Sequence, residues 1–193
     1  MAEFKIMKRI AILASGSGSN AENIIKYFSA NNEVEVPFVI SNRKEVYVHE
    51  RCKNLGVPSY VFPKSDFENG VATKFLLDNK IDLVVLAGFL AIIPQWICEK
   101  WEKRIINIHP SLLPKHGGKG MYGIRVQEAV LAAGDKEAGC TVHYVSAEVD
   151  GGGIIAQEAI AVAADDTPES LAERVQQAEK ALLPQVVGNF VEG

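Results

Sequence analysis

The chain has 193 residues, of which 48% are hydrophobic and 23% are charged, and its formal net charge is −4 at pH 7. This composition is ordinary for a globular domain that can bury a core of its own. The weak negative charge argues against a protein that binds nucleic acid or an anionic membrane surface through a basic patch.

The three cysteines, Cys52, Cys98 and Cys140, are far apart in the chain. Their spacing is typical of reduced thiols in a core and not of a disulfide framework or a zinc site. The first ten residues lack the apolar segment of a secretion signal, and no apolar stretch is long enough to span a bilayer. We therefore expect a cytoplasmic protein.

Apolar runs alternate with amphipathic segments along the first half of the chain, which predicts strands that alternate with helices. Pro37 lies inside the second strand and favours either an edge position or a late start of its pairing. Gly56 and Pro58 end the second helix. The predicted elements are strand 9–14, helix 20–29, strand 34–40, helix 46–55, strand 59–62, helix 67–79 and strand 81–89.

The second half begins in the same way and then changes, because two of its strands are joined by a short turn and not by a helix. Pro184 is expected to kink or split the last helix. The elements are a helix from Pro94, strand 104–108, helix 124–135, strands 140–145 and 154–162, and helix 167–190. The order predicts an α/β fold, Rossmann-like, with an open, mostly parallel twisted sheet, an antiparallel strand near one edge and helices on both faces. We expect a single domain from residue 1 to 193.

The segment ASGSGSNA, residues 14–21, joins the first strand to the first helix. Gly16 and Gly18 let the backbone approach an anion, which the N-terminus of the following helix attracts. The spacing of these glycines and Ala21 also matches the dinucleotide fingerprint, but the acidic residue expected at the end of the second strand is absent. Arg43 there leaves NADP as an alternative. We expect a single phosphomonoester, and a tight turn without any ligand is the simplest competing interpretation.

The segment RIINIHPSLLP, residues 104–114, carries Asn107 and His109 on one face of a strand, because residues two apart project the same way. Asp150 begins the turn DGGG after another strand, where it could face His109 and favour its protonated form. An amide donor, an imidazole and a carboxylate can stabilise the tetrahedral intermediate of acyl transfer. Ser111 lacks the sequence of a nucleophile elbow, so direct transfer between two bound substrates is favoured over a covalent enzyme.

Four segments, NIHPSLLP, ILASGSGSNAENII, DLVVLAGFLAII and TVHYVSAEVDGGGIIAQ, resemble the phosphoribosylglycinamide formyltransferases, a family of folate-dependent enzymes of purine biosynthesis. The similarity runs from about Arg9 to the last helix. It implies transfer of a formyl group from 10-formyltetrahydrofolate, a co-substrate, to the amine of 5-phosphoribosylglycinamide by direct attack. It also implies small-molecule substrates and no metal. In keeping with the charge, we expect no nucleic-acid or membrane partner; a homodimer is one possible assembly, and the oligomeric state is left open.

The resemblance assigns roles to individual residues. Asn107, His109 and Asp150 would be catalytic, with Asp150 raising the pKa of His109. The substrate phosphoribosylglycinamide would be bound by Gly18, Ser19, Asn20, Gln176 and Glu179. The folate would be bound by Lys64, Leu90, Ala91, Ile92, Ile93, Asn107, Ser146, Ala147, Glu148, Val149 and Asp150.

Some features depart from the family or favour its neighbours. Ala91 stands where many members carry arginine, and the long segment 115–125 contains His116 and Lys119, for which the resemblance implies no role. Other 10-formyltetrahydrofolate-dependent enzymes, a methionyl-tRNA formyltransferase or a hydrolase, are the nearest alternatives, but both would be expected to have an additional domain. An NADP-binding reductase would leave Asn107, His109 and Asp150 unexplained. Of the other histidines, we expect His49 on the surface and His143 hydrogen-bonded within the fold.

Overall fold

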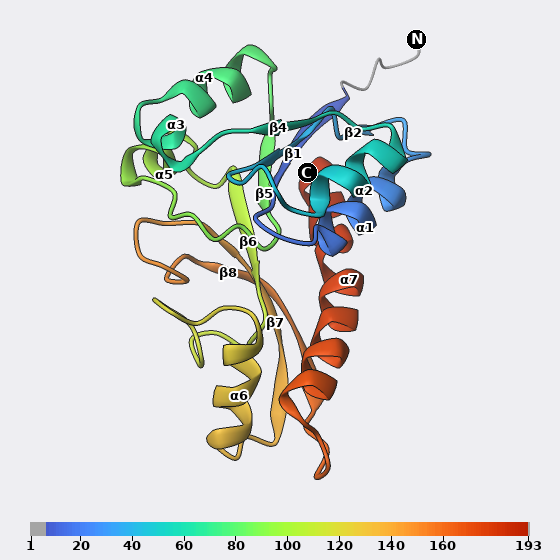
Figure 1. Ribbon diagram of the computed structural model, residues 1–193, viewed down its shortest axis with the longest axis vertical. Helices are drawn as coiled ribbons and strands as arrows, with labels where there is room; N and C mark the ends of the chain where they lie inside the picture. The colour runs from blue at the N-terminus through green and yellow to red at the C-terminus, as the bar shows by residue number, and fades with distance from the viewer. Residues whose placement is uncertain (1–6, 193) are drawn as a thin grey trace. The chain divides into compact units, whose positions relative to one another are not determined.

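The computed structural model describes residues 7–192, and the chain forms two compact units (Figure 1). Within the described chain, the first unit contains residues 7–105 and 189–192, and the second contains residues 106–188. The expected single domain over residues 1–193 stays a prediction. No helix in the described part of the chain is both long enough and apolar enough to cross a membrane.

The first unit is built on parallel strands. Strand β1 pairs with β3 on one side and with β5 on the other, and β3 also pairs with β4, while the short β2 pairs with β1. Ala11 and Ile12 of β1, which project to opposite faces, are fully buried, as expected for a strand covered on both faces. The strands are β1 (Lys8–Leu13), β2 (Val34–Glu35), β3 (Val39–Ser41), β4 (Ser59–Val61) and β5 (Leu83–Leu86).

The order of the strands determines on which face of the sheet each helix of this unit lies. The chain moves from β1 through β3 to β4 and then returns to place β5 on the opposite side of β1. Because parallel crossovers are right-handed, this reversal places α1 and α2 on one face and α3 and α4 on the other. The carboxyl ends of β1 and β5 meet at the reversal, where open α/β sheets bind ligands. The helices are α1 (Ser19–Phe28), α2 (Val48–Leu55), α3 (Lys64–Glu68), α4 (Val71–Asp78) and α5 (Gln95–Lys100).

Two predicted elements of this unit are divided in the structure. The predicted strand 34–40 forms β2 and β3, because Pro37 lies between them and cannot donate to a ladder. β3 is an interior strand, so the late start is confirmed and the edge position is wrong. The predicted helix 67–79 forms α3 and α4, separated at Gly70, whose φ of +87° does not fit a helix. The predicted strand 81–89 is shorter, since only Leu83–Leu86 pair as β5.

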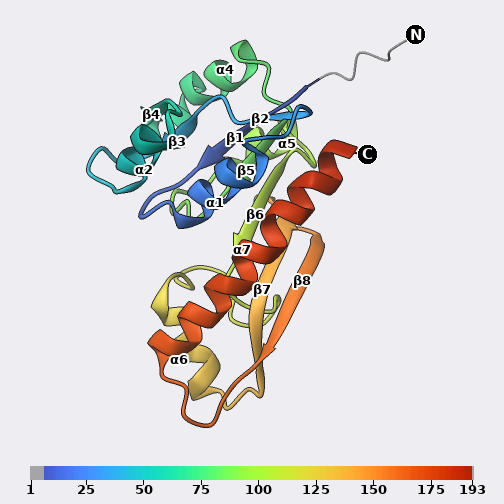
Figure 2. The ribbon, with the colours of Figure 1, turned by 90° about the vertical axis from the view of Figure 1, so that its right-hand side faces the viewer.

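The second unit contains an antiparallel sheet. β7 is antiparallel to β6 and to β8, which makes it the one reversed strand of this group. Figures 1 and 2 show α6 and α7 on opposite sides of β7. The elements are β6 (Ile105–His109), which begins one residue before the unit, α6 (Ile124–Ala132), β7 (Glu137–Tyr144), β8 (Ile154–Ala161) and α7 (Pro168–Glu192).

The long helix α7 is continuous through Pro184, so the expected split does not occur. Its start is as predicted, because the Thr167 hydroxyl accepts a hydrogen bond from the Ser170 N–H at 3.2 Å. Proline removes one backbone hydrogen bond from a helix. Leu183 and Val187, on either side of it, are fully buried, and this packing holds the helix together across the proline.

Candidate active site

In the first unit, Ser15 ties together the ends of three strands. Its N–H donates to the Gly88 carbonyl after β5 at 2.9 Å. Its hydroxyl donates to the Asn42 side-chain oxygen after β3 at 2.6 Å and accepts the Leu90 N–H at 2.8 Å. The loop that follows β1 therefore starts from a fixed point at the sheet reversal.

Gly18 stands directly before α1 and has a φ of +73°, which favours glycine. A Cβ at this position would lie 2.3 Å from the Cγ2 of Val48 on α2. The sequence predicted glycine here for close approach to an anion, and the structure adds close approach to a second helix. Ser19 and Asn20 are the first two residues of α1, so all three predicted phosphate-binding residues lie at one helix N-terminus.

Helix α2 also holds this loop from outside. Arg51 donates from Nε to the Ser17 carbonyl at 2.8 Å and forms an ion pair with Glu22 of α1. The Val48 N–H donates to the Gly16 carbonyl at 3.2 Å. The loop backbone is thereby fixed by contacts that do not use its side chains.

The other predicted ligand-binding residues of this unit lie mostly on its surface. Lys64 is exposed and pairs with Glu68 at 3.2 Å within α3. Leu90 and Ile92 are 47% and 60% exposed, an unusual placement for two large apolar side chains in one short loop, whereas Ile93 is buried. Ala91 between them is half-buried. Contact of these residues with folate stays a prediction.

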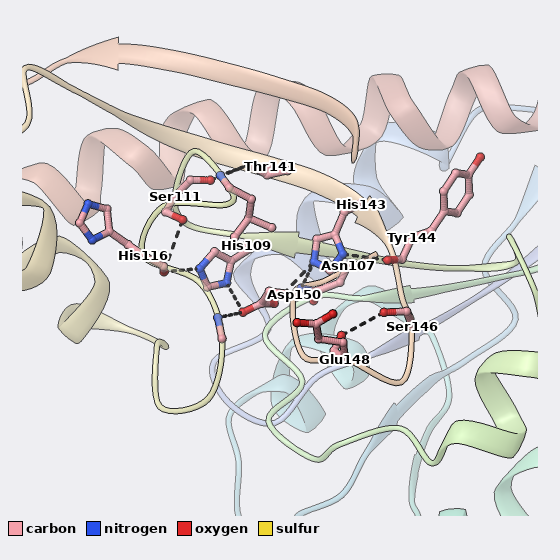
Figure 3. A network of polar contacts seen from close by, with 12 residues as sticks. Asn107, His109, Ser111, His116, Thr141, His143, Tyr144, Ser146, Glu148 and Asp150 are labelled. Carbon is pink, nitrogen blue, oxygen red and sulfur yellow. Dashed lines mark hydrogen bonds and ion pairs between the residues drawn. The ribbon is translucent and has the colours of Figure 1, made fainter. Parts of the chain in front are cut away.

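The second unit contains a buried pair of titrating side chains, shown in Figure 3. His109 is the last residue of β6, and its Nδ1 lies 3.4 Å from the Oδ2 of Asp150, in the loop after β7. The two side chains are only 5% and 10% exposed. On its other side, the His109 Nε2 donates to the His116 carbonyl at 2.9 Å. Since both ring nitrogens face acceptors, only the protonated ring can serve both at once.

Burial acts against that protonated form. The pKa of His109 is lowered below its ordinary value of 6.5, because desolvation outweighs the His116 carbonyl and Asp150, which both act to raise it. The predicted contribution of Asp150, which raises the pKa of His109, is therefore confirmed, but burial reverses the net direction. The pKa of Asp150 is also lowered: burial would raise it, but the nearby ring of His143, the hydrogen bond from the Gly118 N–H and the ring of His109 together outweigh burial. An ionised carboxylate thus lies beside a ring that releases its proton readily.

Asn107 joins this pair through His143, its cross-strand partner on β7. The Nδ1 of His143 lies 2.8 Å from the Tyr144 carbonyl, which can only accept, so this nitrogen carries the proton. The His143 Nε2 then accepts from the Asn107 amide at 3.0 Å and lies 3.6 Å from the Oδ1 of Asp150. The structure therefore brings the three predicted catalytic residues into one network, with His143 at its centre.

The loops around this network are conformationally constrained. Of the four described non-glycine residues with positive φ, two are His116 at +52° and Asp150 at +57°, and both contact His109. Such backbone conformations persist only where the surroundings hold them. A Cβ on Gly152 would lie 1.7 Å from the Tyr144 carbonyl oxygen, so the turn after Asp150 needs glycine to pass close to β7.

Sequence reasoning expected His143 to be hydrogen-bonded within the fold, which is confirmed, but it missed that His143 links Asn107 to Asp150. The alternating pattern of its strand indicated an inward side chain. The missing information was the register of β6 against β7, which pairs Asn107 with His143. It also missed that the His116 carbonyl contacts His109.

The remaining predicted residues of this unit lie in the loop after β7 and on α7, and their contact with ligands stays a prediction. Ser146 donates to the Glu148 carbonyl at 3.0 Å, and Ala147, Glu148 and Val149 are exposed beside it. Gln176 and Glu179 lie three residues apart on α7, half-buried and buried respectively.

Ser111 in this unit and two of the cysteines are buried, which makes them poor nucleophiles. Ser111 is fully buried, and its hydroxyl donates to the Lys115 carbonyl at 2.6 Å. Burial raises the pKa of Cys52 to about 11 and that of Cys140 to about 12, which leaves both as unreactive thiols at neutral pH. Between residues 7 and 192 no group of three or more histidine, cysteine or carboxylate side chains could hold a metal ion.

Comparison with known proteins gives consistent matches. A family model described as formyl transferase matches residues 8–187. A chloroplastic phosphoribosylglycinamide formyltransferase of Arabidopsis thaliana is 42% identical over 96% of this chain and 66% of its own length. The phosphoribosylglycinamide formyltransferase of Haemophilus influenzae is 36% identical over 97% of this chain and 89% of its own.

The crystal structure of phosphoribosylglycinamide formyltransferase from Anaplasma phagocytophilum superposes with a TM-score of 0.88 at 39% identity, covering 96% of this chain and 88% of that one. This similarity confirms the predicted fold class, a mostly parallel sheet with an antiparallel region and helices on both sides. The chain spans about two thirds of the Arabidopsis relative and 14% of the Drosophila melanogaster relative named trifunctional purine biosynthetic protein adenosine-3.

Proposed function

The chain belongs to the formyl transferase family, and from this premise we propose that it transfers the formyl group of 10-formyltetrahydrofolate to the amine of 5-phosphoribosylglycinamide. The observation that carries the proposal is the buried pair of His109 and Asp150, 3.4 Å apart, with Asn107 in the same network. This is the donor set that a tetrahedral intermediate of acyl transfer requires.

His109 and Asn107 act on the carbonyl oxygen in this mechanism. As the substrate amine attacks the formyl carbon, a C–N bond forms and the carbonyl electron pair moves to the oxygen. The Asn107 amide, which has a second N–H besides the one donated to His143, donates a hydrogen bond to that oxyanion, and the positive charge of the protonated His109 ring stabilises it. Collapse of the intermediate breaks the bond to the folate N10. The proton lost by the attacking amine is delivered to N10, so the reaction needs no outside acid or base.

Burial and Asp150 act in opposite directions on the protonation of His109: burial favours release of the proton, and Asp150 favours the protonated ring. A ring whose pKa is depressed by burial gives up its proton readily. The ionised carboxylate of Asp150 stabilises the imidazolium whenever His109 holds a proton. Direct attack by an amine also needs no serine or cysteine nucleophile, in keeping with the buried and structurally bonded Ser111.

We assign the phosphate of phosphoribosylglycinamide to Gly18, Ser19 and Asn20, and further contacts with this substrate to Gln176 and Glu179. Support for the phosphate site comes from the N-terminus of α1, the positive φ of Gly18 and the loop backbone held by Arg51.

Folate binding is assigned to residues of two loops and of α3. The exposed apolar side chains of Leu90 and Ile92 offer a surface for a flat ring system, and residues 147–149 of the second loop are exposed. We propose that Lys64 supplies the basic contact with the folate tail; Ala91 stands where many members carry arginine. The full set is Lys64, Leu90, Ala91, Ile92, Ile93, Asn107, Ser146, Ala147, Glu148, Val149 and Asp150.

We also propose that the chain is one functional domain, that its partners are small molecules, and that it forms a homodimer in the cytoplasm. A single family model runs from residue 8 to 187 and supports the single domain. The buried, unpaired cysteines fit a reducing compartment.

Ultraviolet absorbance during turnover tests the proposed function. Loss of a 10-formylfolate co-substrate only when phosphoribosylglycinamide is present supports the transferase. Loss without that amine would instead identify a hydrolase. Binding of NADPH with no loss of the formyl donor would identify the phosphate loop as a dinucleotide site and overturn the proposal.

A further inference from the structure

His116 and Asp135 form a pair for which sequence and resemblance gave no role. The His116 Nε2 lies 2.7 Å from the Oδ2 of Asp135, which stands between α6 and β7. Their side chains are 16% and 17% exposed, so the contact is largely shielded from water. Lys115 pairs with the other oxygen of the same carboxylate at 3.1 Å, but its side chain is 66% exposed.

The backbone of the same turn holds both members of the catalytic pair. The His116 carbonyl accepts the Nε2–H of His109 at 2.9 Å. Two residues later, the Gly118 N–H donates to the Oδ2 of Asp150 at 2.9 Å. One short segment, residues 116–118, therefore sets the positions of His109 and Asp150 together (Figure 3).

This turn is not a conformation that its residues adopt freely. His116 has a φ of +52°, which is uncommon for a residue with a Cβ. A Cβ on Gly117 would lie 2.4 Å from the Cδ2 of Leu113, so the turn is also closely packed. The side-chain contact with Asp135 anchors His116 to the segment between α6 and β7, about twenty residues away in the chain.

We propose that His116 and Asp135 are positioning residues: their contact holds the turn 116–118 and thereby the orientation and basicity of His109. Neither side chain touches the reacting atoms. The effect passes through the His116 carbonyl, which favours the protonated ring of His109. The expected effect on turnover rests on the proposed formyl transfer.

The titrating groups that act directly on His109 are Asp150, in the loop after β7, and His143, on β7 itself. Asp150 favours the protonated ring of His109, and His143 disfavours it. Loss of the His116 acceptor leaves burial opposed by Asp150 alone. The direction of the expected change is therefore fixed: the pKa of His109 must fall.

The test is Asp135→Ala in the full chain. NMR titration of the histidine ring signals, with His109 assigned by comparison with His109→Asn, should show the pKa of His109 lower by about half a unit or more. We expect kcat to fall about tenfold, with both KM values within about twofold, because positioning and not binding is lost. Asp135→Asn keeps an oxygen acceptor and should recover most of both changes.

Two further variants keep the proposal falsifiable. His116→Gly tolerates the positive φ without the side chain and should reproduce the fall in pKa, even if Asp135→Ala folds poorly. Lys115→Ala removes the other partner of Asp135 and should leave the pKa and kcat unchanged. An unaltered pKa of His109 in folded Asp135→Ala, or an equal change in Lys115→Ala, overturns the inference. The NMR titration needs no substrate. If the proposed function is wrong, the assay of formyl transfer will show no activity, but the change in the pKa of His109 will still be observed.

Discussion

The loop after β1 and the network around His109 are two candidate sites built in different ways. The loop is fixed by backbone contacts, with the carbonyls of Gly16 and Ser17 held by α2. The network is made of side chains, His109, Asp150 and His143, whose charges depend on burial and on one another. A backbone site should therefore be sensitive to added volume, and a side-chain site to changes of charge. The following variants test that difference, from the largest expected effect to the smallest.

The largest effect is expected from removing charge at the side-chain site. Asp150→Asn keeps the shape but removes the partner of the His109 imidazolium, so kcat should fall by about 100-fold or more, as should that of His109→Ala. Steady-state kinetics with both substrates measure this. His49→Asn is the control, since His49 contacts Ser59 and the Arg43 carbonyl in the first unit. Near-normal turnover of folded Asp150→Asn would remove it from the mechanism.

Added volume should damage the backbone site instead. In Gly18→Ala the new Cβ meets Val48 at 2.3 Å in a left-handed backbone, so the free energy of unfolding should fall by about 2 kcal/mol. Urea denaturation measures the change. Gly16→Ala is the matched control for folding, because a Cβ there meets nothing within 4 Å. Equal stability of the two variants would mean that α2 does not constrain the loop.

A smaller effect is expected when the loop loses only its outer support. Arg51→Ala removes the donor to the Ser17 carbonyl and the ion pair with Glu22, so the KM for phosphoribosylglycinamide should rise about fivefold at unchanged kcat. Lys26→Ala removes the other, exposed ion pair of Glu22 and should change neither parameter. If kcat fell instead of KM rising, Arg51 would belong with the catalytic network and the comparison would fail.

The smallest effect is a difference in the pH dependence of stability. His109 has a folded pKa below 6.5, so the unfolded chain binds more protons, and stability is lost as the pH falls from about 6.5 through the folded value. Asp150, whose folded pKa is also lowered, contributes stability above about pH 3.8 that is lost at lower pH. His109→Gln should flatten the first of these slopes in urea denaturation at a series of pH values. Identical slopes in the variant and the parent chain would contradict the burial effect.

The sequence predicted the candidate sites unequally. Gly16 and Gly18 between a strand and a helix indicated the phosphate loop, because the required conformations are local. Asn107 and His109 were also recognisable, since they share a strand face, and Asp150 was placed from its turn. His143 could not be assigned to the network, because its contact with Asn107 depends on the register of two strands. The sequence indicated that Asp150 raises the pKa of His109, but not that the net pKa is lowered, because burial, which the sequence does not state, outweighs the nearby carboxylate.

By itself, the sequence determined the order and type of most elements, the cap at Thr167 and the residues that could carry chemistry, because these follow from short-range patterns of apolar, turn-forming and polar side chains. Tertiary structure alone decided that Pro37 falls between two separate strands, that α7 continues through Pro184, and that the carbonyl of His116 and the ring of His143 complete the network. The physical reason is that these outcomes depend on strand register, packing and desolvation, which arise only when segments distant in the chain come into contact.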